Sequence, residues 1–388
     1  MRFEFATATR IVFGAGTVRD VPAAAAEMGR RALLVTRRSV DFKRAGIAGE
    51  PFPIHFPIHG EPTVDMVRQG TQLARDAACD LVIALGGGST IDAAKAIAAL
   101  LANGGDPLDY LEVVGQAKPP ILPSAPFIAI PTTAGTGAEV TRNAVLRSPE
   151  HRLKASLRSP HMLPRLAVVD PELTLDLPPA LTSSTGLDAL TQLIEPYVSI
   201  RANAMTDLYC AEGMRLAASA LRRAWRDGHD MAARTDMAFA SLLGGLALAN
   251  AGLGAVHGFA APLGGMFDAP HGALCAALLP HAMVVNIAAL RAALSHTGSH
   301  TESHTERLLR YAAVARILTG RSDATPEDGA AWVECLCRDL EIRPLGAHGV
   351  RQADVPALAD KAARASSMQA NPIVLTRGQL EELLTRAI

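Results

Sequence analysis

Four side chains in the second half of the sequence could bind a first-row metal ion. Asp188 and Gln192 stand four residues apart in DALTQLIEPYVS, a spacing that places both on one face of a helix, one turn apart. His257 lies in a run without Asp, Glu, Lys or Arg, from residue 237 to residue 267, and His271 follows shortly after this run. Carboxylate, amide and imidazole groups are all ligands for such ions. The alternative is a metal-free, hydrogen-bonded polar cluster.

The charge-free run is long enough to cross a bilayer. It is interrupted by Pro262 and several glycines, however, and it contains the polar residues Asn250 and His257. We therefore expect closely packed, buried helices around a site, and no association with a membrane.

The elements that must position these residues change in kind along the chain. Up to about residue 178, short apolar runs at 32–36, 81–85, 127–131 and 166–170 alternate with helical stretches such as 63–78. Strands this uniformly apolar are typical of a parallel sheet that helices cover on both faces. Later residues form Ala/Leu-rich helical patterns. The sequence predicts an α/β domain over residues 1–178 and an all-helical domain over residues 179–388.

A glycine-rich turn follows the strand predicted at 81–85, in LGGGSTIDAAKA. Three glycines let the backbone approach an anion closely, and the amino end of the helix that begins near Ser89 suits a pyrophosphate. Asp92 falls in the first turn of this helix, where Lys95 could pair with it, and we count Asp92 with the nucleotide-binding residues. Any tight strand-to-helix turn could use the same glycines, so this motif alone is a weak signal.

A second polar loop, PTTAGTGAEVTRNAV, follows the strand predicted at 127–131. Its threonine hydroxyls would lie at the carboxyl edge of the sheet, where ligands bind in open α/β sheets. Threonine and glycine are also ordinary turn residues. Two such loops at the ends of two strands nevertheless favour one nucleotide-binding crevice.

Four stretches of the sequence together resemble a known family. GGGSTIDAAK, PTTAGTGAEVT, GLDALTQLIEPY and NAGLGAVHGFAAPLGGMFDAPHG are similar to the signatures of the iron-containing (group III) alcohol dehydrogenases, which include lactaldehyde reductase and, more distantly, maleylacetate reductase. The likeness runs from FGAGT at 13–17 to LLPHAM at 278–283. It implies a Rossmann-like dinucleotide-binding domain with a mostly parallel sheet, an all-α domain, the architecture of dehydroquinate synthase, and a cofactor and metal between the domains.

The resemblance also implies the residues that bind the dinucleotide. Gly86, Gly87, Gly88 and Ser89 would bind the pyrophosphate, Thr132, Thr133 and Thr136 would line the adenine and ribose region, Lys154 would lie near the nicotinamide ribose, and Leu173 would pack near the cofactor.

The choice between NAD and NADP depends on the end of the strand predicted at 32–36. Many relatives carry an Asp there, whose carboxylate binds the ribose 2′-hydroxyl and repels a 2′-phosphate. Here Arg37 and Arg38 follow Thr36. A guanidinium accepts a phosphate, so we expect NADP, or the use of both NADP and NAD. The alternative is that both arginines are only solvent-exposed residues at the end of the strand and bind no cofactor.

For the metal, the resemblance implies that Asp188, His257 and His271 are catalytic ligands. The ion, Fe²⁺ with Zn²⁺ as an alternative, would act as a Lewis acid on the substrate oxygen during hydride transfer. Gln192 stands where the family has a histidine, and a neutral amide is a weaker ligand, so a metal-free site is a further possibility. Ala261 stands where relatives carry a proton-relay histidine.

The expected function is that of an NAD(P)-dependent oxidoreductase that interconverts a small alcohol and its aldehyde or ketone. Three alternatives stay open. A maleylacetate-type reductase would need basic residues for its dianionic substrate, and Arg142 is the nearby candidate. A lyase of the dehydroquinate synthase type shares the architecture, and a non-catalytic relative would account for Gln192 and Ala261.

The amino-acid composition of the chain limits the classes of partner that we expect. Net charge is −1, with 37 basic and 38 acidic residues and 4% aromatics, which does not favour a nucleic-acid surface. Five cysteines without a CxxC pair indicate neither a disulfide framework nor a thiolate zinc site. The first residues, MRFEFATATRIVFG, contain no apolar signal segment. We expect a cytoplasmic homodimer that acts on small molecules, with His296, His300 and His304 in a solvated segment rather than a metal site.

Overall fold

A computed structural model describes residues 3–37, 54–151, 153–296 and 302–388 of the 388-residue chain. The predicted Arg38 and His300 lie outside these residues. The chain divides into two compact units, Phe5–Leu177 and Pro178–Ile388, and Phe3 and Glu4 group with the second. We call them the amino-terminal unit and the helical unit.

The amino-terminal unit is built on a six-stranded sheet in the order β1-β8-β5-β4-β2-β3. Each neighbouring pair in this sheet is parallel. The strands are β1 (Arg10–Phe13), β2 (Ala32–Arg37), β3 (Ile54–Ile58), β4 (Leu81–Gly86), β5 (Phe127–Pro131) and β8 (Leu166–Val169). All four strands expected from apolar runs are therefore present, and the predicted fold class, a parallel α/β sheet followed by helices, is confirmed.

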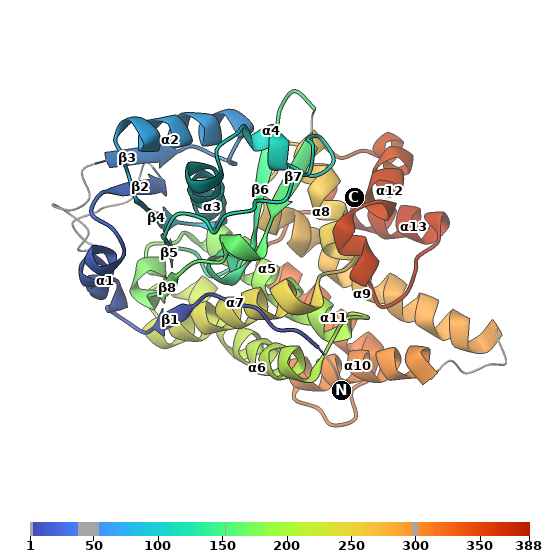
Figure 1. The fold of residues 1–388 in the computed structure, drawn as a ribbon. Coiled ribbons are helices and arrows are strands. Elements are labelled where there is room, and N and C mark those ends of the chain that lie inside the picture. The colour runs from blue at the N-terminus through green and yellow to red at the C-terminus, as the bar shows by residue number, and fades with distance from the viewer. Residues whose placement is uncertain (1–2, 38–53, 152, 297–301) are drawn as a thin grey trace. The chain divides into compact units, whose positions relative to one another are not determined.

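Helices cover both faces of this sheet (Figure 1). The helices of this unit are α1 (Val21–Met28), α2 (Val64–Asp76), α3 (Gly88–Asn103) and the short α4 (Pro107–Tyr110). Side chains alternate along each strand, so Leu33 and Val35 of β2 pack on the side of α2 and α3, whereas Leu34 packs on the side of α1. This burial on both faces explains why the strands are apolar throughout.

Sequence patterns did not predict the small hairpin of this unit. Strands β6 (Asn143–Ser148) and β7 (Leu153–Arg158) pair antiparallel and form a separate two-stranded sheet. Burial alternates along β6, and β7 carries polar residues at alternate positions, so neither strand is a continuous apolar run like those of the main sheet.

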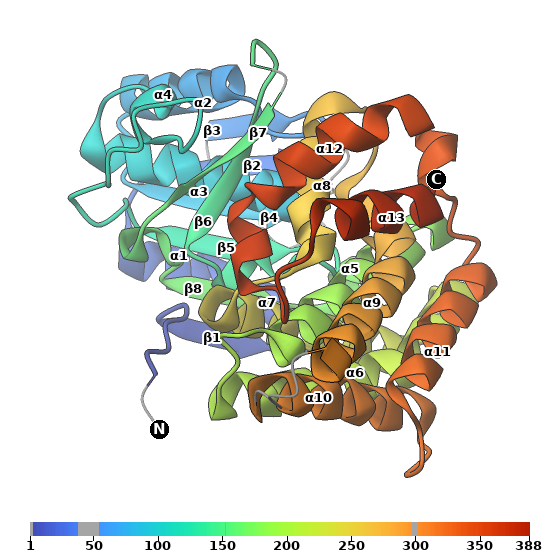
Figure 2. The same ribbon diagram turned by 90° about the vertical axis from the view of Figure 1, so that its right-hand side faces the viewer.

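The helical unit contains the long helices of the chain. They are α5 (Pro179–Val198), α6 (Ala204–Arg226), α7 (Met231–Ala251), α8 (Ala255–Met266), α9 (His271–His296), α10 (Glu302–Thr319), α11 (Pro326–Asp339), α12 (Val355–Ala363) and α13 (Arg377–Ala387). Helix α5 packs against α6, α7 and α9, and α8 packs against α9 and α12. Figure 2 shows α5 and α9 near the middle of this unit and α8 beside α12. Helices α5, α8 and α9 pack together through α9. They carry the candidate metal site.

The charge-free run forms two helices rather than one continuous span. Helices α7 and α8 meet at a bend of 97° around residues 252–254, as the interrupting glycines suggested. By length and composition α9 could cross a membrane, since its residues His271–Ser295 have a mean hydropathy of 1.9. However, 78% of its most apolar window is buried inside the protein, which is the condition of a core helix.

Candidate functional site

Helix α5 supplies the acidic member of the candidate metal site. Asp188 is 1% exposed, and Gln192 follows one turn later at 3% exposure. The Oδ1 atom of Asp188 and the Oε1 atom of Gln192 are buried, and neither accepts a hydrogen bond of good geometry from the described residues. A buried oxygen without a donor costs free energy unless a cation or another group satisfies it.

The first turn of α8 supplies His257, and Glu195 of α5 fixes its orientation. The Nδ1 atom of His257 lies 2.7 Å from Glu195 Oε2, while Glu195 Oε1 accepts a hydrogen bond from the Val256 amide at 2.8 Å. A Cβ at Gly254 would lie 2.9 Å from this carboxylate, so glycine allows the close approach. With Nδ1 turned to Glu195, the Nε2 atom of His257 is the ring nitrogen available for an ion.

The amino end of α9 supplies His271. The next residue, Gly272, packs tightly on α5, because a Cβ there would lie only 2.6 Å from the Ser184 carbonyl oxygen. This close approach places His271 beside Asp188, with 3.7 Å between His271 Nε2 and Asp188 Oδ1. A side chain at position 272 would push the two helices apart.

One residue that the sequence analysis did not include joins the site. Cys275 of α9 is buried, and the ligand atoms of Asp188, His257, His271 and Cys275 all lie within 4.8 Å of one another. The absence of a CxxC pair argued against a thiolate ligand, but that test detects only paired cysteines. The useful signal was the spacing of His271 and Cys275, which equals that of Asp188 and Gln192.

The ionisable side chains of this cluster shift one another's pKa values. Burial by itself would raise the pKa of Asp188, but His271 and His257 outweigh it and hold the pKa below its ordinary value. Burial opposes the charge of His257, whereas Cys275, Glu195 and Asp188 raise its pKa well above the usual range. Burial raises the pKa of the Cys275 thiol to about 12, although His257 acts in the opposite direction. Without an ion, the cluster therefore retains protons that a metal would displace.

These residues fit a divalent cation. The Asp188 Oδ1 atom lies 3.5 Å from His257 Nε2 and 3.7 Å from His271 Nε2, both longer than a good hydrogen bond. A metal-free polar cluster would be expected to close such distances and to satisfy the carboxylate. The structure thus brings together the ligand atoms of Asp188, His257 and His271. The fourth predicted ligand, Gln192, lies one turn after Asp188 on α5, with its Oε1 atom buried and without a donor among the described residues.

The position of the predicted proton relay is also in this unit. Ala261 lies in α8, one turn after His257, and is half-buried. Its methyl group can neither donate nor accept a proton. A histidine at this position would have shared a helix face with His257.

The two predicted nucleotide loops lie side by side in the amino-terminal unit. Strands β4 and β5 are neighbours, with Gly86 opposite Pro131, so both loops leave the same edge of the sheet. A Cβ at Gly88 would lie 2.7 Å from the Thr136 side chain, and one at Gly87 would lie 3.3 Å from Thr133. The Thr132 amide donates to the Gly86 carbonyl at 3.0 Å. The loops form one surface of backbone amides and hydroxyls.

The winding of the sheet favours a ligand at this same edge. Strands β3 and β4 lie on opposite sides of β2, so the direction of winding reverses between β2 and β4. Open α/β sheets bind ligands at the carboxyl ends of the strands beside such a reversal. Arg37 ends β2 with an exposed side chain, and Gly87 caps α3 after β4.

Asp92 has a structural role here. Its carboxylate accepts a hydrogen bond from the Val145 amide at 3.0 Å and pairs with Lys95 at 3.3 Å. Lys95, itself buried, donates to Thr141 Oγ1 at 2.8 Å and to the Asn143 carbonyl at 2.5 Å. This network joins α3 to β6, and direct binding of a cofactor by Asp92 stays a prediction.

The remaining predicted cofactor residues are placed as follows. Lys154 of β7 is buried and pairs with Glu61 at 3.1 Å. Leu173 lies in the short turn Pro171–Thr174 after β8 and packs partly buried against the α1 side of the sheet. Arg142, the basic residue considered for a dianionic substrate, is half-buried.

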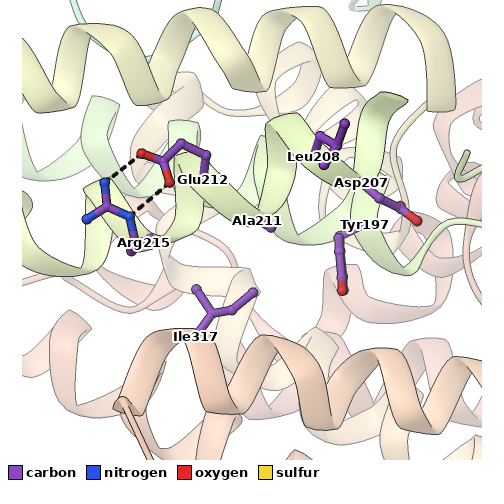
Figure 3. A pocket seen from close by; sticks show the side chains of 7 residues that line it. All are labelled: Tyr197, Asp207, Leu208, Ala211, Glu212, Arg215 and Ile317. Atoms are coloured by element: carbon purple, nitrogen blue, oxygen red, sulfur yellow. Dashed lines mark hydrogen bonds and ion pairs between the residues drawn. The ribbon is translucent and has the colours of Figure 1, made fainter. Parts of the chain in front are cut away.

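A separate hollow of about 580 Å³ opens elsewhere in the helical unit (Figure 3). Its lining residues are Tyr197, Asp207, Leu208, Ala211, Glu212, Arg215 and Ile317. Glu212 and Arg215 pair with each other at 2.6 Å across one turn of α6. None of the clustered ligand residues lines this hollow, so it is not the metal site.

Comparison with known proteins identifies the family. The description "Iron-containing alcohol dehydrogenase" matches residues 8–171, and "Fe-containing alcohol dehydrogenase family, C-terminal" matches residues 182–388. Alcohol dehydrogenase 4 of Saccharomyces cerevisiae is 38% identical over 327 residues, 84% of this chain and 80% of that protein. Lactaldehyde reductase of Escherichia coli is 36% identical over 342 residues, 87% and 84% of the two chains. A crystal structure of 1,3-propanediol oxidoreductase superposes with a TM-score of 0.89 at 30% identity, covering 100% of both chains. The chain therefore belongs to the iron-containing alcohol dehydrogenase family.

Proposed function

We propose that this protein interconverts a small alcohol and its aldehyde or ketone by hydride transfer to and from NADP(H) or NAD(H). The observation that carries the proposal is the Asp188 carboxylate, buried without a hydrogen-bond donor to its Oδ1 among the described residues, beside two imidazole nitrogens. Relatives named alcohol dehydrogenase and lactaldehyde reductase support the reaction class. They favour a dehydrogenase over a lyase of the dehydroquinate synthase type.

The helical unit would hold the metal through Asp188, His257 and His271. A divalent ion there supplies Lewis-acid polarisation of the substrate oxygen. Asp188 contributes the negative charge that balances the ion. Glu195 keeps Nδ1 of His257 engaged, which leaves Nε2 directed at the cluster.

The amino-terminal unit would bind the dinucleotide at the carboxyl edge of its sheet. The glycine turn Gly86–Gly88 leaves backbone amides open to a pyrophosphate at the amino end of α3. Hydroxyls of the neighbouring loop, Thr132–Thr136, supply donors and acceptors for sugar and base. Arg37 at the end of β2 would accept a 2′-phosphate, which supports NADP use.

The alanine at position 261 bears on how the alcohol proton is supplied. Because Ala261 carries no titratable group, the proton would come from water or from a ribose hydroxyl of the cofactor. A slower proton transfer is expected than with an imidazole at this position. Substitution Ala261→His would then raise turnover and introduce a new step in its pH profile.

Two further features of the proposal concern the cellular state of the protein. We propose a homodimer in the cytoplasm. The five cysteines are free in the structure, which agrees with a reducing compartment. Light scattering coupled to size exclusion would measure twice the mass of 40.7 kDa for a dimer.

The function is tested by purifying the protein without chelators, measuring bound metal, and following NADPH and NADH oxidation with short aldehydes, ketones and keto acids. We expect metal-dependent reduction of small aldehydes that chelation abolishes and that added Fe²⁺ or Zn²⁺ restores. Metal-loaded protein that turns over no member of the panel would contradict the proposal. Turnover that survives complete metal removal would contradict only the Lewis-acid part.

A further inference from the structure

Two side chains compete for the fourth ligand position of the metal site, Gln192 and Cys275. Both lie one helical turn from an accepted ligand, Gln192 after Asp188 and Cys275 after His271. Both are buried. They differ in charge, since an amide stays neutral whereas a thiol can lose its proton to become an anionic ligand.

The distances around Cys275 fit those of a metal ligand. Its Sγ atom lies 3.6 Å from His271 Nε2 and 3.9 Å from His257 Nε2. Nitrogen or oxygen ligands at about 2.0 Å and sulfur at about 2.3 Å from one ion would stand about 3.3 to 3.6 Å apart in a tetrahedron. Asp188 Oδ1 lies 3.5 Å and 3.7 Å from the two histidine nitrogens. These four separations lie close to the upper end of the tetrahedral range, and all pairs of ligand atoms lie within 4.8 Å.

The Cβ atom of Gln192 lies close to another helix, although its Oε1 atom is also buried without a donor among the described residues. A Cβ at Gly244 of α7 would lie 3.4 Å from the Gln192 Cβ, so this part of the side chain packs toward α7. Cys275 instead stands on the same helix as His271, and both reach the Asp188 carboxylate. The second independent indication of a ligand is that carboxylate, which is 1% exposed and leaves Oδ1 without a donor among the described residues.

We infer that the Cys275 thiolate is the fourth protein ligand, which makes the site an Asp188, His257, His271 and Cys275 tetrad. The inference rests on the proposed function in that both require a bound metal, and it deepens that proposal by naming the ligand set. The thiol releases its proton to solvent when the ion binds. The chain thus keeps four protein ligands although it lacks a histidine at position 192.

A thiolate changes which ion the site prefers. A site with a soft sulfur ligand binds Zn²⁺, and Co²⁺ as its spectroscopic substitute, more strongly than a site made only of oxygen and nitrogen ligands does. The neutral amide of Gln192 would have weakened binding of any divalent ion. We therefore expect this protein to retain Zn²⁺ more tightly than Fe²⁺ when both are offered at equal concentration.

The test uses the full-length protein loaded with Co²⁺ alone. A thiolate ligand produces a strong sulfur-to-cobalt charge-transfer band in the near ultraviolet, whereas oxygen and nitrogen ligands do not. We expect the band in the unaltered protein and in Cys210→Ser, a matched control in which another buried cysteine of the helical unit is changed. In Cys275→Ser the band should vanish, and Zn²⁺ affinity should fall by more than roughly tenfold.

A second measurement needs no variant, in case Cys275→Ser does not fold. X-ray absorption of the Zn²⁺-loaded, unaltered protein should show one sulfur at about 2.3 Å from the ion. One equivalent of metal with only oxygen and nitrogen neighbours would overturn the inference while leaving the proposed function intact. Failure of the unaltered protein to bind any metal would overturn both the inference and the Lewis-acid part of the proposed function.

Discussion

The two units prepare their ligand sites by different means. The amino-terminal unit offers backbone amides and hydroxyls at the ends of β4 and β5, where Gly88 and Thr136 meet too closely for a larger residue. The helical unit offers buried side chains from three helices, with Asp188, His257 and Cys275 brought together from α5, α8 and α9. The first kind of site depends on local turns, and the second depends on helix packing. A single substitution can therefore alter the ligand set of the second site without changing its fold.

The two units also differ in how they shift the pKa of a buried carboxylate. In the amino-terminal unit, burial raises the pKa of Glu139 to about 7, and the nearby Lys95 offsets burial only in part. In the helical unit, the charges of two histidines outweigh burial, so the pKa of Asp188 lies below its ordinary value. Glu139 is an acid that the fold tends to neutralise. Asp188 is kept as an anion, as a cation site requires.

Substitution Asp188→Asn should have the largest effect of the changes we consider. Asparagine keeps the size of the side chain but removes the charge that balances the ion. Because metal catalysis contributes several kcal/mol of charge stabilisation, we expect kcat to fall by about 1000-fold and bound metal to drop below one equivalent. Steady-state kinetics with NADPH and elemental analysis measure the two effects.

The control for this variant is Asp339→Asn, which removes the same charge from a partly exposed position paired with Arg222. It should retain metal and rate. If Asp188→Asn retained full metal content and turnover, the contrast between the two units would be lost, because Asp188 would then be an ordinary buried polar residue.

Substitution Glu139→Gln tests the other half of the contrast through stability. The folded pKa of about 7 lies above the ordinary value of 4.5, so the folded state favours the protonated acid. The contribution of protonated Glu139 to the free energy of unfolding is fully present below pH 4.5 and is lost as the pH rises through 7. Glutamine cannot ionise, so between pH 5 and pH 8 the variant should gain up to about 3 kcal/mol relative to the unaltered protein.

Urea unfolding at pH 5 and at pH 8 measures this gain. The matched control is Glu27→Gln, which makes the same substitution at an exposed position of α1 and should leave the free energy of unfolding nearly unchanged. A Glu139→Gln variant that loses stability equally at both pH values would show that the carboxylate is ionised and bound in the native state.

Most of the fold followed from the sequence because the elements of the main sheet repeat one physical pattern. β5 occupies the predicted residues 127–131, and β4 extends the predicted 81–85 by a single residue. Strand β3 was not predicted, because IHFPI contains both a histidine and a proline and has no clean apolar run. The β6 and β7 hairpin was missed because polar residues interrupt both strands and leave no continuous apolar run.

The candidate metal site was only partly predictable. Asp188 and Gln192 are visible as a helical pair, but which side chain completes the site depends on how α9 packs on α5. The close contact of Gly272 with the Ser184 carbonyl brings Cys275 to the cluster, and no local pattern encodes that contact. A search for paired cysteines could not find a lone thiol. A search for His and Cys four residues apart would have found it.

Substitution Glu195→Gln should weaken the helical unit's site through the orientation of His257. Glutamate uses both oxygens, one near His257 Nδ1 and one for the Val256 amide. Glutamine has a single acceptor oxygen, so it can accept from the Val256 amide but cannot also accept a proton from His257 Nδ1. Its amide nitrogen could only donate to Nδ1, which would place the imidazole proton on Nε2, the nitrogen needed for the ion. Removal of such a supporting carboxylate costs about 10- to 100-fold in metal affinity.

Competition for Zn²⁺ with a chelator measures this change in the dissociation constant. Glu212→Gln, on the exposed face of α6 and paired with Arg215, provides the control and should bind Zn²⁺ normally. An unchanged dissociation constant in Glu195→Gln would indicate that helix packing alone orients His257.

The smallest effect is expected in the amino-terminal unit, where Arg37→Ala tests cofactor preference. Arg37 is exposed at the carboxyl end of β2, so a guanidinium bound to a 2′-phosphate there remains partly screened by solvent. We expect the KM for NADPH to rise by about tenfold, in line with a charged hydrogen bond of about 1.5 kcal/mol, while the KM for NADH changes little. The control is Arg30→Ala, an exposed arginine near the opposite, amino end of β2. Because the pyrophosphate is common to both cofactors, an equal loss with NADH and NADPH would show that Arg37 supports the loop itself and does not recognise the 2′-phosphate.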